Sequence, residues 1–227
     1  MTVKTKPIAI LVPGALNAHA LQRIEAEFSI HRIEDGLPSS ITPQKVRGVS
    51  TMVTPVSAAL IDALPNLEII ANYGVGYDAV DARHAASRGV MVTNTPDVLT
   101  EEVADTAMGL LLNTIRQLTA AENWLRAGKW QSQGPFPLTP LTLRGRKAGI
   151  FGMGRIGQAI ARRLEASGLS VEYHNRSNAE GLAYTYHPTL KGLAESVDTL
   201  ISVAPGTSST AKAVNAEILS ALGPNGV

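Results

Sequence analysis

The chain has 227 residues, of which 44% are hydrophobic and 17% charged, as in a globular protein with a sizeable core. Its 20 basic and 19 acidic residues give a net charge of +1, which argues against a nucleic-acid or membrane partner. No cysteine is present, so disulfides and thiolate metal sites are excluded, and we expect no metal site. The N-terminal apolar run is too short for a signal peptide, so the cytoplasm is the default location.

Short apolar runs alternate with helical patterns over the first hundred residues. We expect strands at 8–12, 29–34, 67–71 and 90–93, and a further strand, V-S-T-M-V, within 46–53. We expect helices at 15–28, 55–64 and 78–87. This alternation predicts an α/β fold with a parallel sheet, and the short hydrophobic strands are typical of a sheet that is covered on both faces.

One long helix is expected from Thr100 to Ala127, because apolar positions recur on one of its faces. Thr100 can cap its N-terminus. The segment 131–143, which contains a glycine and three prolines, is expected to be irregular. We therefore predict two domains, 1–98 and 99–227.

The most informative stretch is a glycine-rich turn between an apolar run at 148–151 and a helical pattern. Gly152, Gly154 and Gly157 have the spacing G-x-G-x-x-G, and a second strand is expected at 169–174. The first glycine permits a tight turn, the second lets a pyrophosphate approach the backbone, and the third lets the helix pack close to the sheet. The helix N-terminus then faces the phosphates. These features predict a dinucleotide site, and a purely structural turn is the alternative.

The end of the second strand lacks the carboxylate that binds the ribose 2′-hydroxyl in NAD-specific sites. The residues there are Asn175, Arg176 and Ser177, and Glu172 lies earlier on the strand. A guanidinium beside an amide and a hydroxyl suits a 2′-phosphate, because charge-assisted hydrogen bonds contribute about 1.5–3 kcal/mol each. We therefore expect NADP (NADPH) to be preferred, with NAD as the alternative coenzyme. The alternative interpretation is a solvated turn of polar residues that binds no phosphate.

The remaining sequence contains further alternating elements. They are expected at 183–186, 189–197, 199–203 and 215–222. The last residues, G-P-N-G-V, are typical of a turn into another strand, and a doubly wound sheet should not end there. The second domain is therefore expected to be C-terminally incomplete, and the chain a fragment.

Four motifs occur in the order seen in the D-isomer-specific 2-hydroxyacid dehydrogenases, which the chain resembles over nearly its whole length. They are N-Y-G-V-G-Y-D from Asn72, T-P-D-V-L-T from Thr95, V-A-D from Val103 and G-M-G-R-I-G from Gly152. The chain is most similar to glyoxylate/hydroxypyruvate and hydroxyphenylpyruvate reductases. This resemblance implies a flavodoxin-like substrate domain and a Rossmann doubly wound cofactor domain, with the active site in the cleft between them.

The resemblance also assigns residues to the site. Backbone N–H groups of Val75 and Gly76 would hold the substrate carboxylate, although a tight turn alone would also explain the glycines. The coenzyme would contact Thr100, the glycine turn, the end of the second strand and the loop after the fourth. The residues so assigned are Thr100, Gly152, Met153, Gly154, Arg155, Ile156, Gly157, Asn175, Arg176, Ser177, Ala204, Pro205 and Thr210. Thr210 could equally cap a helix.

Catalysis in that family uses an Arg that binds the substrate, a His that acts as general acid and a Glu that raises the pKa of that His. None of the three matches a position here, so no catalytic residue is predicted within the chain, and its five histidines are expected to be structural or at the surface. The implied activity is NADPH-dependent reduction of a small 2-keto acid, of the glyoxylate/hydroxypyruvate type, to the D-2-hydroxy acid by a homodimer.

Several alternatives remain at this point. The chain could be a non-enzymatic, dinucleotide-sensing protein like the corepressors that share this fold, or an inactive fragment of a dehydrogenase. A third alternative is an NAD-using phosphoglycerate or formate dehydrogenase. The lack of an acidic residue at position 175 argues against it. Among single features, Arg144, Arg146 and Lys147 are expected to face water. Trp124 and Trp130 could anchor a subunit interface or be buried within the monomer.

Overall fold

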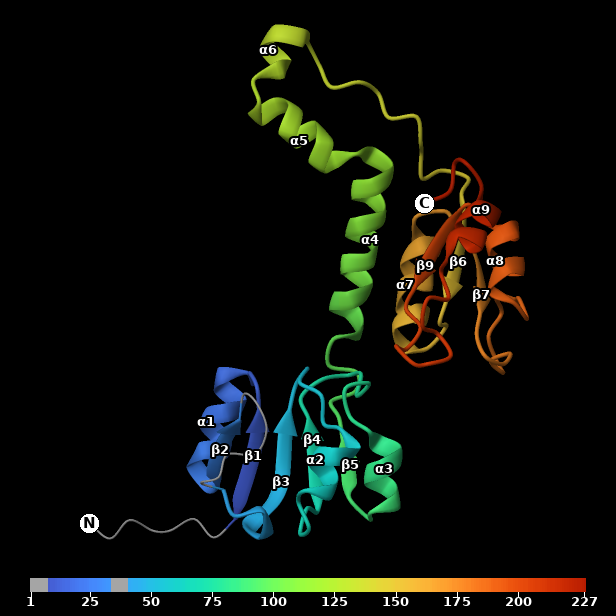
Figure 1. The fold of residues 1–227 in the computed structure, drawn as a ribbon. Coiled ribbons are helices and arrows are strands. Elements are labelled where there is room, and N and C mark those ends of the chain that lie inside the picture. The colour runs from blue at the N-terminus through green and yellow to red at the C-terminus, as the bar shows by residue number, and fades with distance from the viewer. Residues whose placement is uncertain (1–7, 34–40) are drawn as a thin grey trace. The chain divides into compact units, whose positions relative to one another are not determined.

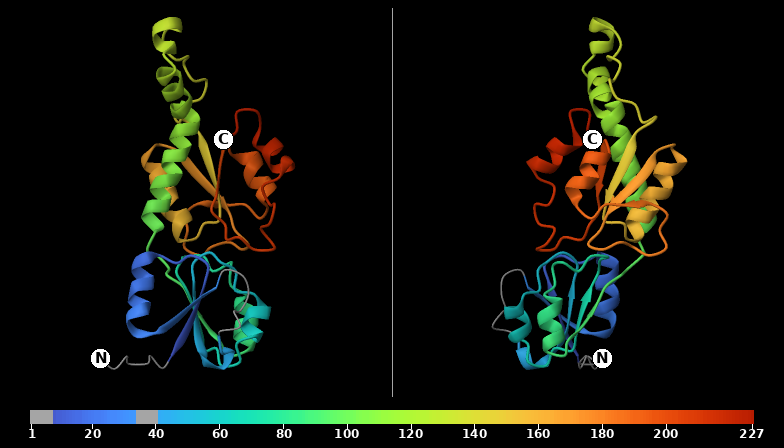
Figure 2. Two further views of the ribbon diagram at one scale, coloured as in Figure 1. Left: turned by 60° about the vertical axis from the view of Figure 1, so that its left-hand side comes forward. Right: turned by 90° about the vertical axis from the view of Figure 1, so that its right-hand side faces the viewer.

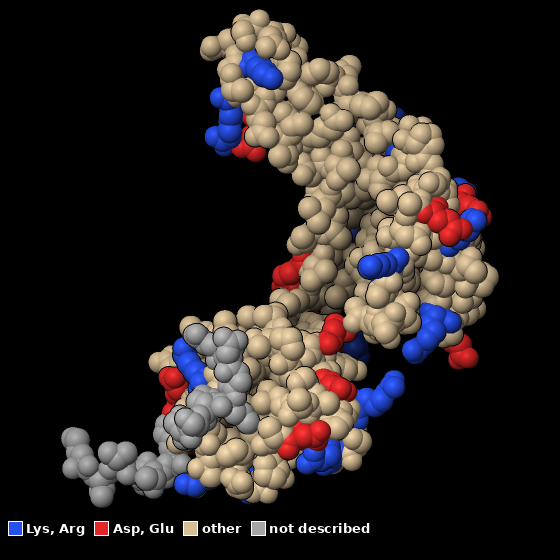
Figure 3. Space-filling view, in the orientation of Figure 1, with Lys and Arg blue, Asp and Glu red and all other residues tan. Residues whose placement is uncertain are grey.

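A computed structural model describes residues 8–33 and 41–227 (Figure 1). The chain divides into two compact units, Met1–Val98 and Leu99–Val227. The C-terminal residue of the strand expected at 29–34, Glu34, lies outside the described residues. No described helix combines the length and the hydropathy that a bilayer crossing requires. On the face drawn in Figure 3, basic and acidic side chains are interspersed.

The first unit is built on a five-stranded parallel sheet in the order β2-β1-β3-β4-β5. Its strands are β1 (Ala9–Pro13), β2 (Ser29–Ile33), β3 (Val46–Thr51), β4 (Ile69–Asn72) and β5 (Met91–Thr93). Its helices are α1 (Ala18–Glu27), η1 (Pro43–Lys45), α2 (Ala58–Asp62) and α3 (Ala82–Ser87). Helix α1 covers one face, and α2 and α3 cover the other (Figures 1 and 2). This order is that of flavodoxin-like sheets, so the predicted fold is confirmed.

The helices of the first unit begin three to four residues later than the hydrophobic pattern predicts, because capping side chains set their starts. Asn17 Oδ1 accepts the N–H of His19 at 3.0 Å and so begins α1. Ser57 and Asp81 cap α2 and α3 in the same way. Each cap satisfies N–H groups that have no partner within the helix.

The second unit is built on a four-stranded parallel sheet in the order β8-β7-β6-β9. Its strands are β6 (Lys147–Phe151), β7 (Ser170–His174), β8 (Thr185–Tyr186) and β9 (Thr199–Ser202). Its helices are α4 (Thr100–Arg116), α5 (Leu118–Arg126), α6 (Lys129–Gln133), α7 (Arg155–Ala166), α8 (Leu190–Ser196) and α9 (Ala216–Leu222). Helices α4 and α7 lie on one face and α8 and α9 on the other (Figure 2). The strand order is that of a Rossmann sheet, as predicted.

The single helix predicted from Thr100 to Ala127 is wrong, because Gln117 interrupts it. Gln117 has a left-handed backbone, with φ 52° and ψ 40°, and separates α4 from α5. Asn113 Oδ1 accepts both the N–H and the hydroxyl of Thr119, which stabilises the break. The capping role of Thr100 is also wrong, because Leu99 is the N-cap residue and makes no side-chain cap. Helix α6 partly overlaps the segment predicted to be irregular.

Arg146 is buried, and its predicted exposure to water is therefore wrong. Its guanidinium donates to Thr199 Oγ1 at 2.8 Å and to the carbonyl oxygen of Asn225 at 2.8 Å. It also contacts Asp198 through the backbone oxygen and through the carboxylate, the latter at 3.1 Å. Arginine tolerates burial here because several acceptors satisfy its donors at once.

The segment around residue 225 lies beside the outer edge of β9. The N–H of Leu200 donates to the carbonyl oxygen of Val227 at 2.8 Å, and the N–H of Val227 donates to that of Asp198 at 3.0 Å. Together with Arg146, these bonds hold the segment against the sheet. The predicted turn at G-P-N-G-V therefore leads into a residue that pairs with β9.

Candidate functional site

Two glycines of the turn after β6 are required by close backbone packing. Gly152 has a φ of +106°, and a Cβ there would lie 2.6 Å from the backbone nitrogen of Ala204. A Cβ on Gly157 would lie 2.3 Å from the carbonyl oxygen of Gly152. The turn, the start of α7 and the segment after β9 therefore approach one another as closely as backbones can. No side chain other than hydrogen fits at either position.

Gly154 differs from Gly152 and Gly157. A Cβ at this position would meet nothing within 4 Å, and its φ is −84°. The fold itself therefore does not require a glycine there, whereas a ligand that approaches the backbone would. Gly154 is also the N-cap residue of α7 and offers no side-chain cap. The first turn of that helix can thus direct N–H groups to an anion.

The glycine turn lies where the strand order of the second sheet reverses. Strand β6 has β7 on one side and β9 on the other, and the chain winds in opposite directions from it. Ligands of such sheets bind beyond the carboxyl ends of the strands at this switch point. Gly152 follows β6 and Ala204 follows β9, so the structure brings these two predicted site residues together. A turn with open space at Gly154 fits a dinucleotide pyrophosphate.

Asn175 is fastened to the glycine turn by a hydrogen bond that the sequence did not reveal. Its Oδ1 accepts the N–H of Met153 at 2.7 Å. The Met153 side chain is buried in the core, so Met153 anchors the turn to the core. Because its oxygen is engaged, Asn175 retains an amide N–H₂ group as a donor. Arg176 and Ser177, which follow, are exposed at the carboxyl end of β7.

The loop after β9 is closed by its own hydrogen bonds. Thr210 Oγ1 accepts the N–H of Thr207 at 2.9 Å and donates to the carbonyl oxygen of Pro205 at 2.5 Å. Thr210 therefore closes a turn, and helix α9 is capped by Asn215 instead. Thr100 lies in the first turn of α4, and among the described residues no hydrogen bond joins its side chain to the glycine turn.

In the first unit, two asparagines hold the turn that contains Val75 and Gly76. Asn72 Nδ2 donates to the carbonyl oxygens of Gly74 at 3.2 Å and of Gly76 at 2.9 Å. Asn94 Nδ2 donates to that of Val75 at 2.8 Å. Within the described chain, the N–H groups of Val75 and Gly76 have no acceptor. Fixed carbonyls on one side and unpaired N–H groups on the other suit an anion.

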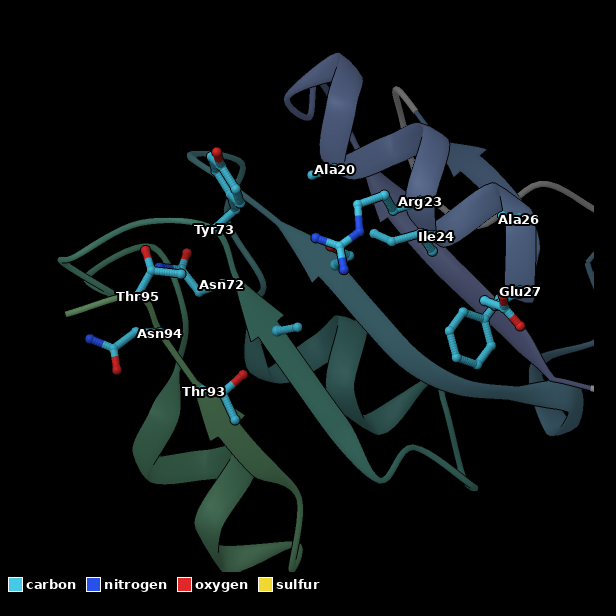
Figure 4. Close-up of a pocket in the computed structure, with 13 residues that line it drawn as sticks. Ala20, Arg23, Ile24, Ala26, Glu27, Asn72, Tyr73, Thr93, Asn94 and Thr95 are labelled. Atoms are coloured by element: carbon cyan, nitrogen blue, oxygen red, sulfur yellow. The ribbon is translucent and has the colours of Figure 1, made fainter. Parts of the chain in front are cut away.

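Sequence reasoning did not assign these supporting roles to Asn72 and Asn94. Both asparagines also line a hollow of about 640 Å³ between α1 and the strands, over which Arg23 extends (Figure 4). The Oδ1 of Asn72 is buried and lacks a partner among the described residues. The signal in the sequence is an Asn at the carboxyl end of each of two adjacent strands.

Glu172 on β7 forms a polar cluster with His187, Ser196 and Lys147. Its Oε2 contacts His187 Nε2 at 2.6 Å and accepts the Ser196 hydroxyl at 2.8 Å, while Lys147 Nζ lies 3.9 Å from Oε1. Burial acts to raise the pKa of the Glu172 carboxyl, but the hydrogen bonds from Ser196 and His187 and the charges of His187 and Lys147 outweigh it. The pKa is therefore lowered from its ordinary value. His187 has a structural partner, as expected for the histidines.

The lowered pKa of Glu172 predicts a contribution to acid stability. A carboxyl whose folded-state pKa is depressed stabilises the fold above its ordinary pKa, and this contribution is lost as the pH falls through the folded value. Urea unfolding of Glu172→Gln should therefore show lower stability at neutral pH, with the difference from the parent shrinking below about pH 4. Glu180→Gln, at an exposed position, is the control and should track the parent. A pH-independent difference would contradict this account.

The fold and the turn together define a class of protein. The sheet is parallel and has the Rossmann strand order. A close-packed glycine turn lies at its switch point, and a polar loop follows β7. Together these features define a dinucleotide-binding domain. Among the described residues, no group of three or more His, Asp or Glu is placed to hold a metal ion.

Comparison with known proteins identifies the family. The family model "D-isomer specific 2-hydroxyacid dehydrogenase, NAD binding domain" matches residues 108–227. Glyoxylate/hydroxypyruvate reductase A of Arabidopsis thaliana is 37% identical, over 97% of this chain and 71% of that protein. Hydroxyphenylpyruvate reductase of Plectranthus scutellarioides is 44% identical, with the same coverage. The chain belongs to the D-isomer-specific 2-hydroxyacid dehydrogenases, which are NAD(P)-dependent oxidoreductases, and the predicted family is confirmed.

A solved structure supports the fold in detail. An NADPH-dependent glyoxylate/hydroxypyruvate reductase from Sinorhizobium meliloti, in complex with NADP and malonate, is 58% identical with a TM-score of 0.91. The alignment covers 97% of this chain and 69% of that one.

Proposed function

We propose that the protein is an NADPH-dependent reductase that converts a small 2-keto acid, of the glyoxylate or hydroxypyruvate type, to the D-2-hydroxy acid. The observation that carries this proposal is the fastened loop after β7, where Asn175 is tied to the glycine turn and Arg176 and Ser177 stand exposed. The relatives named as glyoxylate, hydroxypyruvate and hydroxyphenylpyruvate reductases support the substrate class, and the NADP complex supports the coenzyme.

In this proposal, residues 99–227 form the coenzyme domain. The pyrophosphate lies at Gly154 and the start of α7, including Arg155 and Ile156, while the segment at Ala204 and Pro205 borders the site. The 2′-phosphate is bound by Arg176 and Ser177, with the amide of Asn175 as a further donor. The bound dinucleotide supplies the hydride, and the residues of this chain orient it and neutralise its phosphates.

Residues 1–98 form the substrate domain in the same proposal. The N–H groups of Val75 and Gly76 bind the substrate carboxylate, since Asn72 and Asn94 hold the carbonyl oxygens of this turn. Two N–H donors fixed in advance lose little conformational entropy when the anion binds. The family's catalytic Arg, Glu and His have no counterpart in residues 1–227.

The proposal is tested with the protein at its full encoded length, because this chain covers about 70% of its relatives. Oxidation of NADPH is followed with glyoxylate, hydroxypyruvate and hydroxyphenylpyruvate. We expect turnover with at least one of them, and faster turnover with NADPH than with NADH. Binding of NADPH without turnover of any keto acid would instead support a dinucleotide sensor.

We also propose a cytoplasmic homodimer that associates through α4 to α6. Apolar side chains more than half exposed cluster on and after these helices: Leu110, Leu118, Leu125, Trp130 and Leu138. Trp124 instead packs within the unit, edge-on to Phe136 and with its indole N–H donated to Gly134. Light scattering of the full-length protein measures the oligomeric state, and cell fractionation measures the location.

A further inference from the structure

A buried tyrosine fastens the far end of the loop that follows β7. Tyr173 on β7 has no exposed surface, and its ring lies against that of Tyr186 with centroids 5.5 Å apart. Its hydroxyl donates to Asn178 Oδ1 at 2.6 Å and accepts the N–H of Ala179 at 3.0 Å. A single hydroxyl at the end of a fixed ring therefore holds both the side chain and the backbone of the loop.

The near end of the same loop is fastened independently. Asn175 accepts the N–H of Met153 at 2.7 Å, and the hydroxyl of Tyr186 donates to the carbonyl oxygen of Asn175 at 3.4 Å. Between the two attachments lie Arg176 and Ser177, both exposed. In the described part of the chain, neither side chain forms a hydrogen bond or ion pair. The loop is thus ordered at both ends and free to bind in the middle.

We propose that Tyr173 is a positioning residue for the 2′-phosphate of the coenzyme. Without touching the coenzyme, its hydroxyl holds residues 175–179 in the conformation in which Arg176 and Ser177 receive that phosphate. A loop that is ordered before binding loses less conformational entropy when the ligand arrives, and so binds it more tightly. This inference rests on the proposed function, because it requires that Arg176 and Ser177 bind a 2′-phosphate.

The positioning role makes a selective prediction, since Arg176 and Ser177 are proposed to bind the 2′-phosphate and no other group of the nucleotide. Calorimetric titration of the chain with 2′,5′-ADP and with 5′-AMP separates this group from the rest of the nucleotide. Tyr173→Phe keeps the ring and removes the hydroxyl. We expect the Kd for 2′,5′-ADP to rise about five- to tenfold, which corresponds to about one net hydrogen bond, and the Kd for 5′-AMP to change less than about twofold.

Tyr184→Phe is the matched control, because its hydroxyl donates to Glu165 Oε2 at 2.9 Å and has no bond to the loop. Both Kd values should be unchanged in this variant. Asn178→Ala removes the loop's own partner at an exposed position, and it tests the role even if the tyrosine variant fails to fold. A selective loss is again expected, and the double variant should lose no more than Tyr173→Phe alone, because the bond between the Tyr173 hydroxyl and the N–H of Ala179 remains in Asn178→Ala.

These experiments distinguish failure of the positioning role of Tyr173 from failure of the proposed 2′-phosphate site. Equal weakening of both ligands, or of neither, in Tyr173→Phe and Asn178→Ala would overturn the positioning role. Arg176→Ala tests the site itself. If this change leaves the ratio of the two affinities unaltered, the proposed 2′-phosphate site is wrong. If Arg176→Ala weakens 2′,5′-ADP more than 5′-AMP while Tyr173→Phe and Asn178→Ala do not, only the positioning role of Tyr173 is wrong.

Discussion

Gly157→Ala is expected to lower the free energy of unfolding by at least about 3 kcal/mol, at the upper end of what overpacking costs, and to abolish measurable dinucleotide binding. The added Cβ would lie 2.3 Å from the carbonyl oxygen of Gly152 and 3.2 Å from Ile150 Cγ2. Helix α7 would have to move away from the turn. Gly152 has little room to move, because a Cβ built on it would already lie 2.6 Å from the backbone nitrogen of Ala204. Urea unfolding and calorimetric titration with NADPH measure the two effects.

Gly154→Ala provides the matched control for this steric argument. The new methyl group meets nothing within 4 Å, so stability should change by less than about 1 kcal/mol. Binding of NADPH should nevertheless weaken strongly, because the methyl group occupies the space into which we place the pyrophosphate. Equal stability losses in the two variants would contradict the packing argument. Undiminished binding in Gly154→Ala would remove the pyrophosphate from this position.

The coenzyme half of the candidate site could be predicted because its signals are local. Strands β6 and β7 are short apolar runs, the glycines lie between them at fixed spacing, and α7 shows helical periodicity. Each element is specified by residues within about one turn or strand of itself. The same holds for the alternating strands and helices of the first unit, although its capping residues moved the helix starts.

The features that escaped prediction depend on residues far apart in sequence. Arg146 is buried because Thr199 and Asn225 supply acceptors from segments 53 and 79 positions away. No local pattern in the sequence indicates that Arg146 is buried. The break at Gln117 depends on the side chain of Asn113 reaching Thr119, which competes with a helical pattern that continues through it.

Replacing Asn175 by Asp and Arg176 by Ala together is expected to shift the coenzyme preference from NADPH to NADH. Loss of the guanidinium removes charge-assisted hydrogen bonds of about 1.5–3 kcal/mol each, which corresponds to about 10- to 150-fold in affinity for NADPH per bond. The structure explains why Asp fits at position 175. One carboxylate oxygen can still accept the N–H of Met153, as Asn175 Oδ1 does at 2.7 Å. The other replaces an amide donor by an acceptor for a ribose hydroxyl and repels a 2′-phosphate.

The measurement is the ratio of the Kd values for NADPH and NADH, with Arg144→Ala as the control. Arg144 is also an exposed arginine, but it precedes β6 and so lies at the opposite end of the strand from the glycine turn. Its removal changes the net charge by −1, half of the change of −2 in the double variant, so it reports any general electrostatic attraction of phosphates, which ionic strength screens. A shift confined to the variant at 175 and 176 assigns discrimination to the loop. A shift in Arg144→Ala about half as large, in free energy, as that of the double variant would assign discrimination to the net charge. An unchanged ratio in the double variant would mean that the 2′-phosphate binds elsewhere.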